Sequence, residues 1–239
     1  MKKHIRKLLR WMPGRWKGQM DYYFDSHAGS EFGGPLNGQT LRWAIFAEMT
    51  KAIPFNAVVE TGTFRGVTTR YFAQETNLPV FSVELEQRYF EYSKLSLRDC
   101  KNVALSLGDS RAFLNKLIND PACPKRNVFF YLDAHWNADL PLYDEINLIG
   151  DHWANSVVMI DDFEVPDDPG YAFDDYGGGA KLSLEYIQPL LKDKWSVFFP
   201  VAKSEDETGF KRGSVVLVAK GLEGTFGEIK SLRRYDSPD

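Results

Sequence analysis

The sequence has little cysteine and no long apolar run. Only Cys100 and Cys123 occur among its 239 residues. Neither a disulfide framework nor a zinc knuckle is therefore indicated, and a reducing, cytoplasmic setting is favoured. No apolar stretch is long enough to span a bilayer. Apolar residues still make up 44% of the chain, which suits one large domain or one domain with additions.

Acidic side chains are absent from the first 20 residues, which carry seven basic ones. These are Lys2, Lys3, Arg6, Lys7, Arg10, Arg15 and Lys17. The remainder therefore holds 22 basic and 33 acidic residues, a net charge of −11. An acidic body of this kind argues against broad nucleic-acid binding.

The basic N-terminus has apolar residues near helical spacing, at Ile5, Leu8, Leu9, Met12 and Trp16. Two interpretations stay open: a packed or frayed terminal helix, or a basic amphipathic helix through which residues 1–17 contact the inner membrane surface peripherally. A signal peptide is not favoured, because the apolar part is short and no small-residue cleavage site follows.

Residues 21–38 are rich in glycine and aromatic residues and are predicted to be a loop. This loop is either a lid over a site or a structured lead-in that packs on the sheet, and the lead-in is favoured. A helix is predicted from Thr40, its N-cap, to about Lys51. Its inward-facing residues are predicted to be Leu41, Ile45 and Met49. We divide the chain into a basic segment with lead-in helix, residues 1–50, and a main domain, residues 51–239.

Strand-like apolar runs then alternate with helical segments. The predicted strands are 57–60, 80–84, 103–107, 128–132, 157–160, 195–199 and 214–219. The predicted helices are 67–74, 87–97, 111–118, 142–149 and 182–191. This alternation predicts an α/β fold of doubly wound, Rossmann-like type. We expect a mostly parallel seven-stranded sheet with helices on both faces and an N-terminal helical extension.

Carboxylates follow these strands where they end. They are Glu60, Glu84, Asp109, Asp133, Asp161 and Asp162. Parallel strands bring such ends to one edge of the sheet, so the carboxylates are expected to converge around one crevice. Such a cluster repels itself unless hydroxyls, cations or a metal satisfy it.

The first strand leads into a turn with two glycines, Gly62 and Gly66. The turn lacks the Gly-x-Gly-x-x-Gly pattern of dinucleotide sites and a phosphate-loop lysine. Glu84 ends the next strand, 24 residues past Glu60, where a carboxylate can accept hydrogen bonds from ribose hydroxyls. The pattern suits a nucleoside without a pyrophosphate. A solvated strand end is the alternative for Glu84.

Asp133, Asp161 and Asp162 end two strands that are expected to be neighbours. Three hard oxygen ligands without a nearby cysteine suit Mg²⁺ or a similar divalent cation. The alternative is helix capping and loop hydrogen bonding, which adjacent aspartates often provide.

These motifs, in order, resemble a known family. They are Glu-Thr-Gly-Thr-Phe-Arg-Gly at 60–66, Ser-Val-Glu-Leu at 82–85, Gly-Asp-Ser at 108–110, Leu-Asp-Ala-His-Trp at 132–136 and Ile-Asp-Asp-Phe at 160–163. The series is similar to that of class I S-adenosylmethionine-dependent methyltransferases. Within that class it resembles the metal-dependent O-methyltransferases of the macrocin type, which act on sugar hydroxyls. The resemblance covers about residues 55–220.

The resemblance implies roles for individual residues. Those implied to bind S-adenosylmethionine are Glu60, Gly62, Thr63, Gly66, Glu84, Asp109 and Ser110. Glu60 and the two glycines would line its methionine part, Glu84 would hold the ribose, and Asp109 with Ser110 would lie by the adenine. The implied metal ligands are Asp133, Asp161 and Asp162.

Methyl transfer needs a base for the acceptor hydroxyl, and His135, beside Asp133, is our candidate. The family places its base three residues past the metal aspartate, where this chain has Trp136. His135 is alternatively a structural residue. The weaker candidates are His152, Lys181 and Lys203.

The segment after the aspartate pair, residues 166–181, is either a polyol-binding lid or a mobile acidic surface loop. Its candidate polar residues are Asp167, Asp168, Tyr171, Asp174, Asp175 and Tyr176, with a possible hinge at Gly177, Gly178 and Gly179. The expected partner is a hydroxylated small molecule such as a sugar or glycoside, in a chain that could form a homo-oligomer. The alternatives are a hydroxylase-like metal enzyme on the same fold and a non-catalytic S-adenosylmethionine-binding protein.

Overall fold

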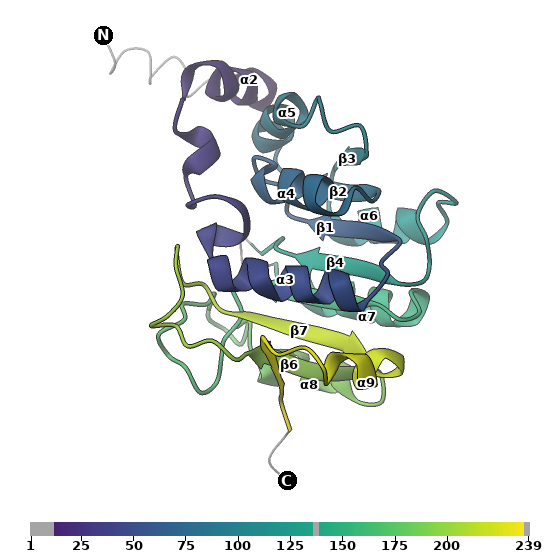
Figure 1. The fold of residues 1–239 in the computed structure, drawn as a ribbon. Helices are drawn as coiled ribbons and strands as arrows, with labels where there is room; N and C mark the ends of the chain where they lie inside the picture. The colour runs from purple at the N-terminus through teal and green to yellow at the C-terminus, as the bar shows by residue number, and fades with distance from the viewer. Residues whose placement is uncertain (1–11, 136–138, 237–239) are drawn as a thin grey trace.

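The structure is a computed structural model and describes residues 12–135 and 139–236. Its described residues form one sheet of eight strands in the order β3-β2-β1-β4-β5-β7-β6-β8 (Figure 1). The strands are β1 Ala57–Thr61, β2 Val80–Glu84, β3 Val103–Leu107, β4 Val128–Leu132, β5 Val157–Asp161, β6 Trp195–Pro200, β7 Ser214–Ala219 and β8 Leu232–Arg234. Strands β1 to β5 are parallel, and β7 pairs antiparallel with both β5 and β6.

Helices cover both faces of the sheet, as the alternating pattern predicted. The helices are α2 Gly14–Phe24, α3 Thr40–Ala52, α4 Val67–Thr76, α5 Gln87–Ser96, α6 Ser110–Ile118, α7 Leu142–His152, α8 Leu184–Leu191 and α9 Glu223–Phe226. Short 3₁₀ turns occupy η1 Ala28–Ser30, η2 Pro35–Gly38 and η3 Lys220–Leu222. Helices α3, α4 and α9 pack into one buried cluster, and α6, α7 and α8 pack into the other (Figure 1).

The central strands are buried along their whole length, which explains their continuous apolar sequences. Every residue of β1, β4 and β5 is buried, as expected for a parallel sheet with two covered faces. Strand β1 lies between β2 and β4, so the chain order reverses at this point. A doubly wound sheet opens a crevice at the carboxyl ends of such strands, and ligands bind there.

The strand count was wrong by one. The seven predicted strands are present, but β8 adds an eighth on the outer edge of β6. It has three residues, two of them arginine, so neither length nor apolar pattern marks it as a strand.

The N-terminal part differs in detail from its prediction. Helix α2 extends to Phe24, into the segment predicted as loop, and packs on α5 through Gly18. A Cβ on Gly18 would lie 2.0 Å from the Arg88 carbonyl oxygen, so only glycine allows this approach. Helix α3 has Gln39 as its N-cap instead of Thr40.

The inward face of α3 also differs. Ile45 and Met49 are buried as predicted, but the third predicted residue, Leu41, is only half-buried, and Arg42 is buried beside it. The division of the chain at residue 50 stays a prediction.

Most of the proposed amphipathic helix, and the part of residues 1–17 before Met12, lie outside the described residues. Within the described part of the chain, no helix combines the length and apolar character that crossing a bilayer requires.

Candidate functional site

The glycine turn after β1 packs directly on the end of β4. Gly62 and Gly66 have φ angles of +88° and +74°, a conformation that L side chains rarely adopt. A Cβ on Gly62 would lie 2.1 Å from the Asp133 carbonyl oxygen. The Asp133 N–H in turn donates to the Thr61 carbonyl over 2.9 Å. The predicted tight turn is therefore confirmed, and Gly62 brings two strand ends into backbone contact.

Glu84 is bound to this turn from the neighbouring strand. Its carboxylate accepts hydrogen bonds from the N–H groups of Phe64, over 2.7 Å, and Glu86, over 2.8 Å. Burial raises the pKa of Glu84 to about 7, although both N–H groups favour the ionised form.

A cavity of about 420 Å³ opens beside Glu84, and we call it the Glu84 cavity. Its lining residues are Gly62, Phe64, Val83, Glu84, Leu85, Glu86, Tyr89, Gly108, Asp109, Ser110, Arg111, Ala134, Asp139 and Pro141. The volume lies within the range usual for small-molecule sites. The structure thus brings together four of the seven predicted cofactor residues: Gly62, Glu84, Asp109 and Ser110.

Asp109 is the N-cap of α6 and accepts hydrogen bonds from the N–H groups of Arg111 and Ala112. The Arg111 guanidinium bridges Asp109 and Asp139, over 2.8 Å to each. Hydrogen bonding to Arg111 lowers the pKa of Asp109. This end of the cavity therefore presents an ionised carboxylate held by an arginine that the sequence reasoning did not select.

Three predicted cofactor residues lie elsewhere. Glu60 is fully buried and accepts hydrogen bonds from the Thr69 and Ser82 hydroxyls. Burial raises its pKa to about 7. Neither Glu60 nor Gly66 lines the Glu84 cavity or the two other cavities beside it, and Thr63 lines only one of these three, of about 60 Å³. Glu60 therefore joins β1, β2 and α4 behind the turn.

A second cavity, of about 400 Å³, lies on the β4 and β5 side of Gly62, and we call it the Asp133 cavity. Its lining residues are Phe32, Asn37, Gly62, Phe64, Asp133, His135, Asp162, Asp174, Tyr176, Phe210 and Arg212. Gly62 and Phe64 are the two residues that it shares with the Glu84 cavity. Two ligand-sized spaces therefore meet over one glycine.

One wall of the Asp133 cavity is aromatic. The Phe32 ring lies edge-on to Phe64 and Phe210, with centroids 5.5 and 5.8 Å apart. Phe32 is 39% exposed and Phe210 is 51% exposed, which is unusual for phenylalanine. These rings come from three distant segments. The neighbouring glycines at 33, 34 and 209 were the only sequence signal that could have marked two of them.

Another part of the cavity wall is polar. The Arg212 guanidinium pairs with Asp162 and Asp174, and the Tyr176 hydroxyl donates to Asp174 over 2.6 Å. Burial and the neighbouring Asp161 raise the pKa of Asp162 to about 7.

The other polar residues proposed for the loop after β5 bind protein groups away from this cavity. Asp167 pairs with Arg233, Asp168 accepts from Ser204, and the Tyr171 hydroxyl donates to the Ala202 carbonyl. Asp175 accepts from the Gly177 N–H. Asp174 and Tyr176 are therefore the loop residues that reach the site.

Asp161 lies behind the cavity wall and is 1% exposed. Its oxygens accept from the Arg42 guanidinium, the Asp162 N–H, the Tyr131 hydroxyl and the Asn37 amide. Burial raises the pKa of this carboxyl, but Arg42 and Tyr131 outweigh that effect and lower it.

The predicted metal ligands do not form a fitting donor set. Within residues 12–135 and 139–236, no three histidine, cysteine, aspartate or glutamate side chains are placed to hold a metal ion. Asp161 and Asp162 are already paired with Arg42 and Arg212. Asp133 faces the cavity, where burial and the two other carboxylates raise its pKa well above the ordinary value.

The predicted base, His135, does line the Asp133 cavity. His135 is 4% exposed, and neither ring nitrogen makes a hydrogen bond of good geometry with the described residues. Burial lowers the pKa of His135 to about 4, so the imidazole is neutral near pH 7. Trp136 lies outside the described residues.

The weaker base candidates lie away from the cavities. Lys181 pairs with Glu164 over 2.7 Å. Lys203 is exposed, and His152 is the last residue of α7, three residues beyond the predicted end of that helix.

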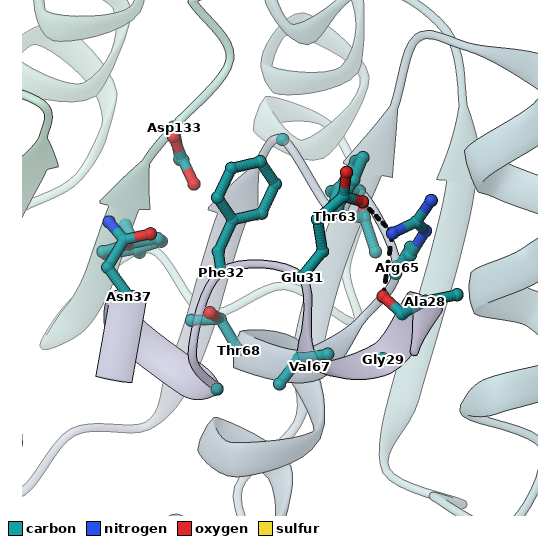
Figure 2. Close-up of a pocket in the computed structure, with 14 residues that line it drawn as sticks. Ala28, Gly29, Glu31, Phe32, Asn37, Thr63, Arg65, Val67, Thr68 and Asp133 are labelled. Atoms are coloured by element: carbon teal, nitrogen blue, oxygen red, sulfur yellow. Dashed lines mark hydrogen bonds and ion pairs between the residues drawn. The ribbon is translucent and has the colours of Figure 1, made fainter. Parts of the chain in front are cut away.

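The lead-in segment, residues 28–38, is tied to the glycine turn. Figure 2 shows the Arg65 guanidinium bound to the Ala28 carbonyl, over 2.8 Å, and to Glu31. The Leu36 N–H donates to the Thr68 hydroxyl over 3.1 Å. A third cavity, of about 60 Å³, remains beneath the segment. The favoured interpretation as a structured lead-in agrees with these contacts, and Phe32 and Asn37 from this segment also close the Asp133 cavity.

Comparisons with known proteins give structural matches alone. No protein-family model and no curated protein sequence matches the chain. Among solved structures, the O-methyltransferase TomG from Streptomyces achromogenes, in complex with SAM, is 16% identical, with coverage of 87% of this chain and 90% of that one and a TM-score of 0.54. An O-methyltransferase from Bacillus cereus, in complex with SAH, is 14% identical, with coverage of 88% and 93% and a TM-score of 0.55. A putative O-methyltransferase from Klebsiella pneumoniae is 14% identical, with coverage of 90% and 94% and a TM-score of 0.50. The chain therefore has the Rossmann-like α/β fold of these O-methyltransferase structures.

Proposed function

We propose that this protein is an enzyme that transfers a methyl group from S-adenosylmethionine to a hydroxyl of a small molecule. The observation that carries the proposal is the pair of cavities that meet over Gly62 and Phe64. Methyl transfer needs two sites of this arrangement, because the acceptor oxygen must approach in line with the sulfur–methyl bond. The solved structures of similar fold support the choice of cofactor, since one was determined with S-adenosylmethionine (SAM) and another with S-adenosylhomocysteine (SAH).

The cofactor is proposed to occupy the Glu84 cavity. Glu84 would accept hydrogen bonds from the two ribose hydroxyls at the end of β2. Asp109 and Ser110 at the start of α6 would lie beside the adenine. The sulfonium would then lie near Gly62, the residue without a side chain between the two cavities.

The acceptor is proposed to occupy the Asp133 cavity, and a sugar or glycoside suits its two walls. The aromatic wall of Phe32, Phe64 and Phe210 can cover the apolar face of a sugar ring. Asp174, Tyr176 and Arg212 offer hydrogen-bond partners to its hydroxyls.

The reaction needs little activation of the donor, because the sulfonium is a good leaving group. A lone pair of the acceptor oxygen attacks the methyl carbon, and the carbon–sulfur bond breaks to leave S-adenosylhomocysteine. The oxygen becomes strongly acidic as the new carbon–oxygen bond forms, so a weak base suffices to take its proton. His135, neutral and in this cavity, is proposed as that base, with Asp133 as the second candidate.

The divalent metal expected from the sequence is not part of the proposal. Asp161 and Asp162 are paired with arginines, and the described residues hold no fitting donor set. The steps above use side chains of this protein alone.

Two measurements test the proposed function. Calorimetric titration should show one S-adenosylhomocysteine per chain, and incubation with labelled S-adenosylmethionine and a panel of sugars, glycosides and phenols should give a labelled ether. Binding without transfer to any acceptor would favour a non-catalytic binding protein. No binding at all would refute the proposal.

A further inference from the structure

We infer that Arg42 occupies the charge-compensating position beside Asp161 that the sequence assigns to a divalent cation. The side chains of Arg42 and Asp161 are both buried, each with 1% of its surface exposed. A buried carboxylate must be paired with a cation or lose its charge. Here the partner is a guanidinium supplied by α3, from a part of the chain 119 residues away.

The carboxylate of Asp161 has no position left for a metal. An ionised carboxylate has about four lone-pair sites. The first oxygen accepts from Arg42 and from the Asp162 N–H over 2.8 Å. The second accepts from Tyr131 and from the Asn37 amide over 2.8 Å. A metal ion would have to displace at least one of these donors, and Arg42 would then be a buried cation beside a second cation.

The neighbouring carboxylates cannot form the site without Asp161. Asp162 accepts a hydrogen bond from Nε of Arg212, and a terminal nitrogen of the same guanidinium donates to Asp174. Of the three carboxylates that line the cavity, Asp162 and Asp174 are both paired with Arg212, and only Asp133 has no arginine partner within the described residues. Ca²⁺ takes roughly 6–8 oxygen ligands, and Mg²⁺ binds through one or two carboxylates only where waters and substrate oxygens complete its coordination, so Asp133 alone does not supply a stoichiometric site in the free protein.

Arg42 also fixes the polar wall of the Asp133 cavity. Its second terminal nitrogen donates to the Arg212 carbonyl. Gln39, the N-cap of α3, also binds the backbone of Arg212. Its side-chain nitrogen donates to the Arg212 carbonyl over 3.0 Å, and its side-chain oxygen accepts from the Arg212 N–H over 2.8 Å. The start of α3 therefore sets the position of the side chain that binds Asp162 and Asp174. Under the proposed function, Arg42 is a positioning residue for the acceptor site.

The first test measures metal binding by the wild-type protein without cofactor. Mn²⁺ titration followed by electron paramagnetic resonance should show no stoichiometric site at millimolar metal. One bound Mn²⁺ per chain, lost in Asp161→Asn, would overturn the inference. The result does not depend on S-adenosylmethionine, so failure of the proposed function would leave it unaffected.

The second test measures the pair itself through thermal unfolding of Arg42→Met, Asp161→Asn and the double variant. Each single change should lower the unfolding temperature, because it leaves a buried charge or donor without its partner. The double variant should lose less than the two single losses added together. If the loss of unfolding temperature in the double variant equals the sum of the two single losses, the inferred pairing of Arg42 with Asp161 is overturned. If Arg42→Met does not fold, recovery of folded protein in the double variant supports the pair, and continued failure counts against it.

Discussion

The N–H of Phe64 donates to the Glu84 carboxylate over 2.7 Å, and this bond joins the glycine turn after β1 to the end of β2. The turn, which is proposed to lie near the sulfonium, and the carboxylate, which is proposed to hold the ribose, are thus fixed to each other before any ligand binds. A preformed arrangement of this kind lowers the entropy lost on binding.

Replacing Glu84 by glutamine should weaken S-adenosylhomocysteine binding about 10- to 100-fold. The change removes the charge from hydrogen bonds to the ribose, and such bonds contribute roughly 1.5–3 kcal/mol. Calorimetry on Glu84→Gln and on Glu75→Gln, an exposed glutamate that lines neither large cavity, gives the comparison. Equal affinities in the two variants would place the ribose elsewhere.

Binding of S-adenosylhomocysteine should also depend on pH. Burial raises the pKa of Glu84 to about 7, so most of the carboxyl is protonated at pH 6 and ionised at pH 8. Ribose hydroxyls donate to the ionised form, and the affinity should therefore rise about tenfold between these values. The rise should be absent in Glu84→Gln, and a rise of the same size in that variant would assign it to another group.

His135→Gln should lower the rate of methyl transfer by about 10²- to 10⁴-fold, the usual range for loss of a general base. Affinity for S-adenosylhomocysteine should stay within about twofold, because His135 lines only the Asp133 cavity. Single-turnover rates and calorimetry separate the two effects. Full activity in His135→Gln with a large loss in Asp133→Asn would transfer the role of base to Asp133.

Gly62→Ala should destabilise the fold more than Gly178→Ala. Both glycines have positive φ, +88° and +61°, so each alanine suffers backbone strain of about 1–3 kcal/mol. Only at Gly62 does the new Cβ meet a backbone atom, the Asp133 carbonyl oxygen, whereas nothing lies within 4 Å at Gly178. Chemical unfolding of both variants measures the difference, and equal losses would contradict the close approach of the two strand ends.

Glu60→Gln should make stability less dependent on pH. Burial raises the pKa of Glu60 from 4.5 to about 7, so the folded state holds the proton more tightly than the unfolded state. The free energy of unfolding therefore falls as pH rises through this window and stays lower above it. Unfolding at pH 5 and pH 8 should show a fall that is smaller in Glu60→Gln by about 2–3 kcal/mol. An unchanged fall would show that Glu60 is ionised throughout.

Much of this fold could be predicted from the sequence, because the central strands are buried on both faces and therefore consist of continuous apolar runs. Glu84 and the glycine turn after β1 could be predicted for the same reason, since each lies at the end of such a strand. The outer strand β8 could not be predicted, because its three residues carry no apolar pattern.

The second half of the site was less predictable. Arg42 lies on a helix whose other inward residues are apolar, and nothing local distinguishes a buried arginine from an exposed one. The structural role of Arg42 depends on Asp161, which lies 119 residues away in the sequence. Phe32 and Phe210 likewise gain their role only when two distant loops meet. Contacts between residues far apart in the chain leave no periodic signal, so sequence patterns found the acids but not their partners.

The two large cavities share Gly62 and Phe64, both also use the segment after β4, and their remaining residues come from separate parts of the chain. The Glu84 cavity comes mainly from the ends of β2 and β3 and the segments after them, whereas the Asp133 cavity is completed by the lead-in segment and by the loops after β5 and before β7. Mutations in those late loops can therefore reshape the proposed acceptor pocket while the proposed cofactor pocket keeps its form. An architecture of this kind lets the choice of acceptor evolve independently of the cofactor, and it marks residues 28–38, 163–181 and 201–212 as the places to exchange when a new acceptor is sought.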